Sequence, residues 1–397
     1  AWRPAVLSLP LAHLRRGRSS FMLCDAMSDR LPFEPPDPRL LAGPPGETFR
    51  RQFQVRQLLR RASGAAAERR AELEKEILVH GLAALPAARA AVRSRDPSVA
   101  ALGRSVLRAL TPEEIGQQLA AGLSQDENGY PLELGATLLA RLGDPLLALA
   151  PVLKQIDLLA RKAERFIFEA LQAPVDRRVL EQRPLDVIVQ LGEFWRKEGF
   201  QGNIEDYYDV RNSWLPHALE HHTGLPIVLS ILYLALCRRL GVQAEGVGLP
   251  WHFIVRIEVA LKTAPGYVFI DPFHGARPLD LDDCRKLVES SGQSFDPAEH
   301  LRPLTPREVL LRMCNNLLAA YDQHKEARAA EGVATVLVHL GPQNPAPFLI
   351  RAERRLRRGA YRDARMDLHT MLLLDPPPPM AQAAVALLRQ IDYEHPF

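Results

Sequence analysis

The stretch GLPIVLSILYLALCRRLG, residues 224–241, decides the fold that this sequence predicts. Its apolar side chains fall on every face of a helix, which indicates a helix that runs through a core. Pro226 suits the first turn, Thr223 or Gly224 is the expected N-cap, and Gly241 after two arginines is a typical stop. The stretch therefore predicts a buried helix around which the rest of a domain packs.

A β-hairpin is expected directly after this helix. In HFIVRI, residues 252–257, apolar Phe253 and Val255 alternate with His252, as in a strand. KTAPG, residues 262–266, predicts a turn, and YVFID returns as a second strand that ends at Asp271. His252 begins one strand and Asp271 ends the next, so both lie at the same open end. A carboxylate placed there orients an imidazole, as in a nucleophilic triad, and we expect the two side chains to be hydrogen-bonded.

The order of these motifs resembles the transglutaminase-like fold, an offshoot of the papain-like cysteine enzymes. More narrowly, YYDVRNSWLPHALEHHTGLPIVLSILYLALCRRLGVQAEGVGLPWHFIVR, residues 207–256, is similar to the bacterial regulator-of-SirC-expression family, whose transglutaminase-like domain also occurs in certain F-box proteins. The resemblance covers residues 182–397. It implies an α+β, mostly helical protein in which a transglutaminase-like domain, residues 182–300, is flanked by helical-repeat regions.

The resemblance also implies a missing nucleophile. In active members the catalytic Cys stands at the N-terminus of the core helix, where the helix dipole favours a thiolate. Counting back from Gly241, this position is Ile227, and the regulator family has the same Pro-Ile pair in place of the Cys. His252 and Asp271 are then remnants of a triad, and the expected protein is not an enzyme.

Three further residues are candidates for lining the cleft. Ser230 lies one turn beyond Ile227, but its alcohol would need an access route and a strong base to act as a nucleophile. Asn212, in DVRNSW, either lines the cleft or, more simply, caps a helix through SWLPHALEHH. His274 either reaches the mouth of the cleft or, as a loop histidine, is solvated, which we favour.

No metal and no cofactor are expected. The cysteines are far apart with no CxxC spacing, which argues against a zinc site and a disulfide framework and favours a reducing cytoplasm. His221 and His222 are adjacent on an expected helix and point apart, so they do not share a metal. The four cysteines are Cys24, Cys237, Cys284 and Cys314. Cys237 is expected to be a small core residue, and Cys284 and Cys314 have no His or acid arranged beside them.

The segments before the central domain differ in character. Residues 1–45 are rich in proline and are expected to be extended or disordered, with Met22 or Met27 as an alternative start. Residues 46–181 show apolar spacings of three and four, typical of helices, and are loosely HEAT-like. Within them, residues 97–111 and 112–124 are two separate stretches with this helical spacing.

Residues 301–397 predict a tetratricopeptide-like tail. Gly359, Tyr361, Ala364 and Pro376 have the offsets of the turn glycine, aromatic, small residue and terminal proline of one repeat, and Lys325 replaces the glycine 34 residues earlier. About three repeats are usually needed for stability, so we expect the tail to dock elsewhere, and we favour the central domain. One helical face carries Arg351, Arg354, Arg355 and Arg358.

The arginine face has two interpretations. It either binds an acidic partner or nucleic acid, or it is a solvated outer face, which we favour because no aromatic side chains are interleaved with it. The net charge of +3 over 397 residues gives no whole-chain field for nucleic acid or membrane. The longest nearly apolar run, residues 225–237, is shorter than the ~20 residues that span a bilayer.

Two functions are therefore open. The favoured one is a non-catalytic cytoplasmic interaction or regulatory module with a protein partner. The alternative is a cysteine-protease-like acyl transferase or amide hydrolase with an unconventional nucleophile. Residue 227 separates the two, because a thiol there would favour the enzyme and Ile227 favours the module.

Overall fold

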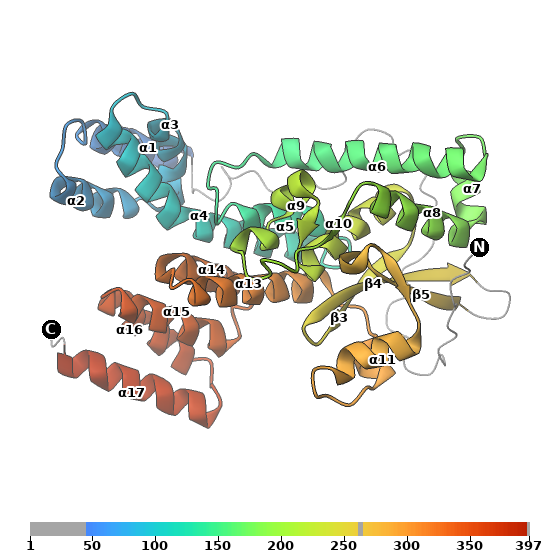
Figure 1. Ribbon diagram of the computed structural model, residues 1–397. Helices are drawn as coiled ribbons and strands as arrows, with labels where there is room; N and C mark the ends of the chain where they lie inside the picture. The colour runs from blue at the N-terminus through green and yellow to red at the C-terminus, as the bar shows by residue number, and fades with distance from the viewer. Residues whose placement is uncertain (1–44, 261–264, 395–397) are drawn as a thin grey trace. The chain divides into compact units, whose positions relative to one another are not determined.

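The computed structural model describes residues 45–260 and 265–394 and confirms the α+β, mostly helical class (Figure 1). Its described residues form two compact units. The mixed unit comprises Asn128–Thr137 and Ala148–Met313, and the helical unit comprises residues 45–127, Leu138–Leu147 and residues 314–394. The predictions for residues 1–44, including Cys24 and the alternative starts, lie outside the described residues, as does most of the predicted turn at 262–266.

The mixed unit contains all the described strands and the helices around them. Helices α5 (Leu132–Ala140) and α13 (Pro306–Gln323) have residues in both units. The remaining elements of the mixed unit are α6 (Leu149–Leu171), α7 (Arg177–Gln182), α8 (Pro184–Lys197), β1 (Gln201–Gly202), η3 (Val210–Ser213), α9 (Leu215–His221), β2 (Thr223–Gly224), α10 (Pro226–Arg239), β3 (Ala244–Leu249), β4 (His252–Ala260), β5 (Pro265–Asp271), η4 (Pro272–His274), β6 (Arg277–Leu279), α11 (Leu281–Glu289) and α12 (Pro297–His300).

A four-stranded antiparallel sheet, in the order β3-β4-β5-β6, forms the centre of the mixed unit. Helix α10 packs against β3 and β4. On β4 the side chains of Phe253 and Val255 alternate with that of Ile254, which belongs to a separate core with Cys284 of α11. Both faces of the sheet are therefore covered, which explains why three successive residues of β4, Phe253, Ile254 and Val255, are all buried.

Helix α10 is the predicted core helix, and its residues Pro226–Cys237 are all buried. Gly241 follows its C-terminus with a φ of 74°, and the amide of Val242 donates to the carbonyl of Cys237 at 2.9 Å, as in a glycine-terminated helix. The predicted caps are wrong. Thr223 and Gly224 form β2, paired in parallel with β1, and the N-cap is Leu225 with no side-chain hydrogen bond.

The helical unit brings together two parts of the chain that are far apart in sequence. The first part contains α1 (Pro45–Arg60), α2 (Ala67–Leu78), η2 (Gly81–Ala84), α3 (Leu85–Val92) and α4 (Pro97–Gln125), and the second contains α14 (Ala327–Leu340), α15 (Pro345–Arg357), α16 (Tyr361–Leu372) and α17 (Pro378–Glu394). The two stretches with helical spacing on either side of Pro112 form one helix, because α4 continues through this buried proline. A proline removes one backbone donor but does not end a helix whose flanking turns are packed on neighbours.

Helix α14 of the tail packs on α4, a contact that the sequence does not predict. The beginning of the tail contacts the central domain, as expected, because the amide of Leu304 donates to the carbonyl of Gly246 and Arg312 of α13 contacts the ends of β3 and β4.

Two glycines let α4 and α14 approach closely. A Cβ on Gly116 of α4 would lie 2.4 Å from the ring of His339, and a Cβ on Gly332 of α14 would lie 3.0 Å from the ring of Pro112. Neither glycine marks a turn, so their role as contact points has no local sequence signal.

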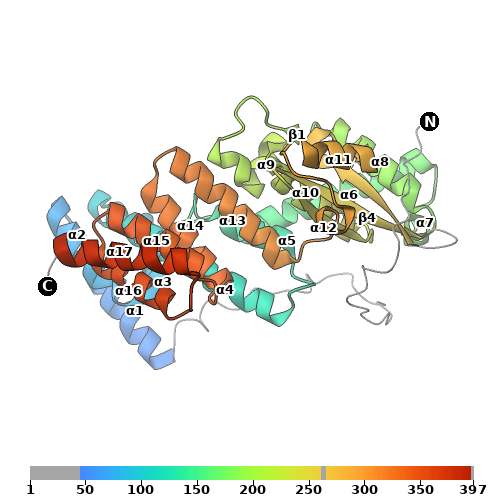
Figure 2. The same cartoon turned by 90° about the horizontal axis from the view of Figure 1, so that it is seen from below.

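Helices α14, α15, α16 and α17 pack on one another in chain order (Figures 1 and 2). The turn before α14 contains Lys325 with a φ of 59°, and the turn before α16 contains Gly359 with a φ of 77°. The two turns, 34 residues apart, thus share a left-handed position. Among the described helices, none is long and apolar enough to cross a membrane.

Candidate functional site

The predicted pairing of His252 and Asp271 is confirmed. His252 begins β4 and Asp271 ends β5, and the antiparallel register, with Val255 opposite Ile270, brings these two ends together. Nε2 of His252 lies 2.9 Å from Oδ2 of Asp271. The carboxylate is fully buried and the imidazole is nearly so, so the geometry fixes the ring through one of its two nitrogens, as the acid of a triad does.

His274 joins this pair, contrary to the expectation of a solvated loop histidine. Its Nδ1 lies 2.7 Å from the same Oδ2 of Asp271, although 48% of its side chain remains exposed. Oδ1 of Asp271 accepts hydrogen bonds from the backbone amides of Phe273 at 3.1 Å and His274 at 3.3 Å, and thereby caps η4. The short helix therefore folds His274 back onto the carboxylate, a contact that three-residue spacing alone does not reveal.

The contacts among Asp271, His252 and His274 shift the pKa values of Asp271 and His274. Burial alone would raise the pKa of the Asp271 carboxyl, but hydrogen bonds from His252 and His274 outweigh it and hold that pKa well below its usual range. The hydrogen bond to Asp271 in turn raises the pKa of His274. The site thus holds one buried carboxylate, ionised at neutral pH, between two imidazoles.

Packing around η4 holds the group in place. The indole Nε1 of Trp195 donates to the carbonyl of Pro272 at 3.0 Å, and the ring of Phe273 lies edge-on to His252 with centroids 5.8 Å apart. A Cβ on Gly202 would lie 2.2 Å from the ring of Phe273. The aromatic ring therefore rests on bare backbone of β1, and only glycine fits there.

The position expected for a nucleophile is apolar. Ile227 occupies the second position of α10, and only 2% of its surface is exposed. A buried hydrocarbon side chain at the amino end of α10 offers no atom for covalent catalysis. The role of Ile227 as the replaced nucleophile remains the interpretation drawn from the family resemblance.

The hydroxyl of Ser230 is used in a hydrogen bond to the backbone and is not available as a nucleophile. The Ser230 side chain is fully buried, and its Oγ donates to the carbonyl of Phe253 at 3.2 Å. The three described cysteines are also buried and free of disulfides. Burial raises the pKa of Cys237 strongly and raises the pKa of Cys284 and of Cys314 to about 12, so none is a thiolate at neutral pH.

Asn212 has a structural role that differs from the predicted cap. It is fully buried within η3, and the N-cap of α9 is Trp214. Its Nδ2 donates to the carbonyls of Asp206 at 2.6 Å and Tyr207 at 3.2 Å, and its Oδ1 accepts from Asn203 at 3.0 Å. The amide therefore holds the loop before η3 in shape.

His221 and His222 have separate surroundings, as adjacent positions predict. The ring of His222 stacks on Phe200 with centroids 4.4 Å apart, and its Nδ1 contacts the carbonyl of Glu198. The ring of His221 lies 4.2 Å from that of His217 one turn earlier in α9. The two adjacent histidines thus do not converge on one point.

Sequence reasoning missed a strained turn beside His252. Trp251 joins β3 to β4 with a φ of 54°, and 78% of its surface is exposed. Partly buried Arg312 of α13 donates to the carbonyl of His252 at 2.8 Å and also to that of Leu249, so it clamps both strand ends. Nothing local in the sequence links Arg312 to this turn, because they are about 60 positions apart.

The mixed unit also has a hollow of about 690 Å³ between α8 and the edge of the sheet. Its polar lining forms ion pairs and hydrogen bonds of its own, including Arg196 to the carbonyl of Gly275 at 2.9 Å and Arg277 to Asp283 at 3.4 Å. It is also lined by Gln190, Ile270 and Ala276. His252 and His274 do not line this hollow.

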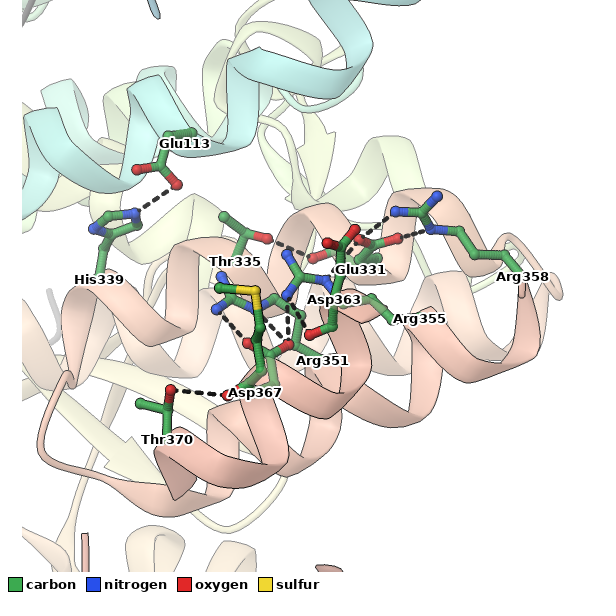
Figure 3. A network of polar contacts seen from close by, with 11 residues as sticks. Glu113, Glu331, Thr335, His339, Arg351, Arg355, Arg358, Asp363, Asp367 and Thr370 are labelled. Atoms are coloured by element: carbon green, nitrogen blue, oxygen red, sulfur yellow. Dashed lines mark hydrogen bonds and ion pairs between the residues drawn. The ribbon is translucent and has the colours of Figure 1, made fainter. Parts of the chain in front are cut away.

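The arginine face of the tail is neither open to a partner nor simply solvated (Figure 3). Arg351 forms an ion pair with Asp367 of α16 at 2.7 Å. Arg355 forms ion pairs with the same Asp367 at 2.7 Å and with Glu331 of α14 at 3.2 Å. Arg358 also binds Glu331, and Arg354 binds Asp322. The four arginines therefore join α15 and its C-cap to α13, α14 and α16, which corrects both interpretations from the sequence.

Comparison with known proteins identifies the relatives of this chain. Residues 151–315 match the model of the transglutaminase-like superfamily. A UPF0162 protein of Xylella fastidiosa is 34% identical over 198 residues, which is 49% of this chain and 69% of the relative. The UPF0162 protein of Pseudomonas aeruginosa is 28% identical over 205 residues, 51% of this chain and 72% of the relative.

A shorter likeness extends to eukaryotes. Human F-box only protein 21 is 36% identical over 124 residues, 30% of this chain and 19% of that protein. No solved structure matches the chain. On the strength of the bacterial relatives, the chain belongs to the UPF0162 protein family and carries a transglutaminase-like domain.

Proposed function

We propose that this protein is a non-catalytic transglutaminase-like module that acts in the cytoplasm by binding a protein partner. The observation that carries the proposal is Ile227, buried at the amino end of α10, where the transglutaminase-like fold would need a thiol. His252 and Asp271 keep the geometry of the base and its orienting acid. A base without a nucleophile favours a binding role for the site.

The alternative, an acyl transferase or amide hydrolase with an unconventional nucleophile, has little support among the described residues. The hydroxyl of Ser230 donates to a backbone carbonyl. The thiols of Cys237, Cys284 and Cys314 are buried with raised pKa values. Free, buried cysteines also agree with a reducing compartment.

The flanking helices support an interaction role. The left-handed turns at Lys325 and Gly359, 34 residues apart, favour two tetratricopeptide-like units in the tail. Helices α1 to α4 are loosely HEAT-like, and α4 completes the packing of the tail. On this proposal the chain shares with the regulator-of-SirC-expression family both its domain order and a regulatory role.

Exposed apolar side chains near the site indicate where a protein partner would bind. The exposed Trp251 directly precedes His252 of β4. The ring of Tyr207 lies 6.4 Å from that of Phe273, and the loop that contains Tyr207 also contains the exposed Ile204 and Tyr208. Large exposed apolar groups on one side of a domain are typical of protein interfaces.

An activity assay tests the proposal. We expect purified protein to show no turnover of glutamine or peptide amides, while an active transglutaminase assayed in parallel does. Iodoacetamide should label no thiol stoichiometrically in a Cys24→Ser variant, which removes the cysteine outside the described residues. Turnover that is lost in His252→Gln and kept in His369→Gln, an exposed histidine of α16, would establish the enzyme and refute the module.

A binding experiment tests the partner role. Proteins that co-purify with the full chain should be lost with Trp251→Ala and kept with Tyr393→Ala, since Tyr393 is an exposed aromatic on α17. Recovery of the same proteins with both variants would contradict a partner face beside His252.

A further inference from the structure

The most concentrated group of metal-binding side chains in the described part of the chain is His252, Asp271 and His274. One ligand atom from each, the two imidazole nitrogens and a carboxylate oxygen, lies within 4.8 Å of the others. Two imidazoles and one carboxylate form a ligand set typical of zinc and other divalent transition metals. The family resemblance accounts for His252 and Asp271 but not for His274.

The distances fit a common centre. Two ligands of one tetrahedral zinc ion, each about 2.0 Å from it, lie about 3.3 Å apart. Oδ2 of Asp271 is 2.9 Å from Nε2 of His252 and 2.7 Å from Nδ1 of His274. An ion that replaced the two shared protons would need to part these atoms by a few tenths of an ångström. The half-exposed ring of His274 has room for this movement.

The surroundings orient the ligand atoms, as outer contacts do in metal sites. The other carboxylate oxygen of Asp271 is held by the backbone amides of Phe273 and His274. Arg312 fixes the backbone of His252 through its carbonyl. The carboxylate and one imidazole are therefore held rigidly, and the third ligand closes the site from the solvent side.

We propose that His252, Asp271 and His274 bind one divalent transition-metal ion, for which Zn²⁺ is the reference. Three protein ligands leave a fourth tetrahedral position, and the exposure of His274 places it towards solvent. A water molecule or an anionic group of a ligand would occupy that position. This inference is independent of the proposed partner binding, because it rests on the donor atoms alone.

The test is a zinc titration of the full chain after removal of metals by a chelator. By calorimetry, we expect a site of one Zn²⁺ per chain that weakens at least about 100-fold in His274→Gln, since loss of even an outer contact typically costs 10–100-fold. Zinc should also raise the melting temperature of the wild type but not of His274→Gln. His369→Gln, at an exposed histidine of α16, is the matched control and should bind as the wild type.

A competing site must be separated from this one. His217 and His221 lie one turn apart in α9 with ring centroids 4.2 Å apart, an arrangement that can chelate metals. A His217→Gln/His221→Gln double variant should retain the site. The proposal is overturned if this double variant alone abolishes zinc binding, or if His274→Gln, shown by circular dichroism to be folded, binds zinc as tightly as the wild type.

Discussion

Oδ1 of Asn212 accepts a hydrogen bond from Nδ2 of Asn203 at 3.0 Å, and this contact ties η3 to the chain that follows β1. The same buried side chain donates to two carbonyls, so all its polar atoms are satisfied inside the loop. The loop carries Tyr207 and Tyr208, whose rings contact each other. The shape of one side of the candidate site thus depends on a single amide.

Asn212→Ala should lower the free energy of unfolding by about 1–3 kcal/mol, because buried donors and acceptors lose their partner. Urea denaturation measures this change. Asn315→Ala is the control, since Asn315 is exposed on α13 and its replacement should change stability by less than about 0.5 kcal/mol. Equal losses in the two variants would contradict the role of Asn212.

Gly116→Ala should destabilise the helical unit although alanine is the better helix former. The added methyl group would lie 2.4 Å from His339, so α4 and α14 would have to separate, at a cost of about 1–3 kcal/mol. Gly46→Ala in α1 is the matched control. No atom lies within 4 Å of a Cβ there, so thermal unfolding should show no loss of stability for this variant.

Glu331→Gln should weaken the tail, because it removes the charge that Arg355 and Arg358 share. We expect a loss of about 1–3 kcal/mol at neutral pH, less than for a fully buried pair because Arg358 is half exposed. Chemical denaturation of the full chain measures it. An unchanged midpoint would show that the arginines find equivalent partners.

The same carboxylate gives a pH dependence of known sign. Burial would raise the pKa of Glu331, but its hydrogen bonds with Arg358 and Arg355 outweigh this and hold it below the usual value of about 4.5. The unfolded chain therefore binds the proton more readily. The stabilisation that the Glu331 carboxylate provides is complete above the pKa that Glu331 has in the unfolded chain, and it is lost as the pH falls through the lower pKa that Glu331 has in the folded protein. Stability measured from pH 6 to pH 3 should fall less steeply in Glu331→Gln.

Trp251 should be replaceable by glycine without loss of stability. A left-handed backbone costs an ordinary residue about 1–2 kcal/mol, and the exposed indole buries little surface in return. Relief of this strain in Trp251→Gly should at least offset the added freedom of the unfolded chain. Trp251→Val, branched at Cβ, should be less stable than Trp251→Gly by about 1 kcal/mol or more. A Trp251→Gly variant less stable than the wild type would show that the indole stabilises the turn, and a Trp251→Val variant as stable as Trp251→Gly would contradict the backbone strain.

The sequence predicted the features that depend on local patterns. The apolar run of α10 and the alternation in β4 led to a buried helix beside a hairpin, and antiparallel geometry then brought His252 to Asp271. These inferences succeed because helix and strand periods fix which side chains meet.

Other features depend on contacts between distant segments. The clamp of Arg312 on His252 and the ion pairs around Glu331 need the tertiary fold before they can be recognised. The continuous helix through Pro112 is a similar case, because its packing overrides a local signal. The return of His274 to Asp271 is short in sequence, but it depends on the left-handed Gly275 that ends η4.

The packing of α4 on α14 sets an order of events during synthesis. Glu113 and His339, which meet in this contact, are 226 positions apart. At 5–20 residues per second, α14 leaves the ribosome about 10–45 s after the part of α4 on which it packs. For that interval the surface around Pro112 and Gly116 has no α14 to cover it. The helical unit is thus completed only after the whole mixed unit has been synthesised, and a nascent chain halted before α14 should be bound by chaperones and cleaved readily by proteases.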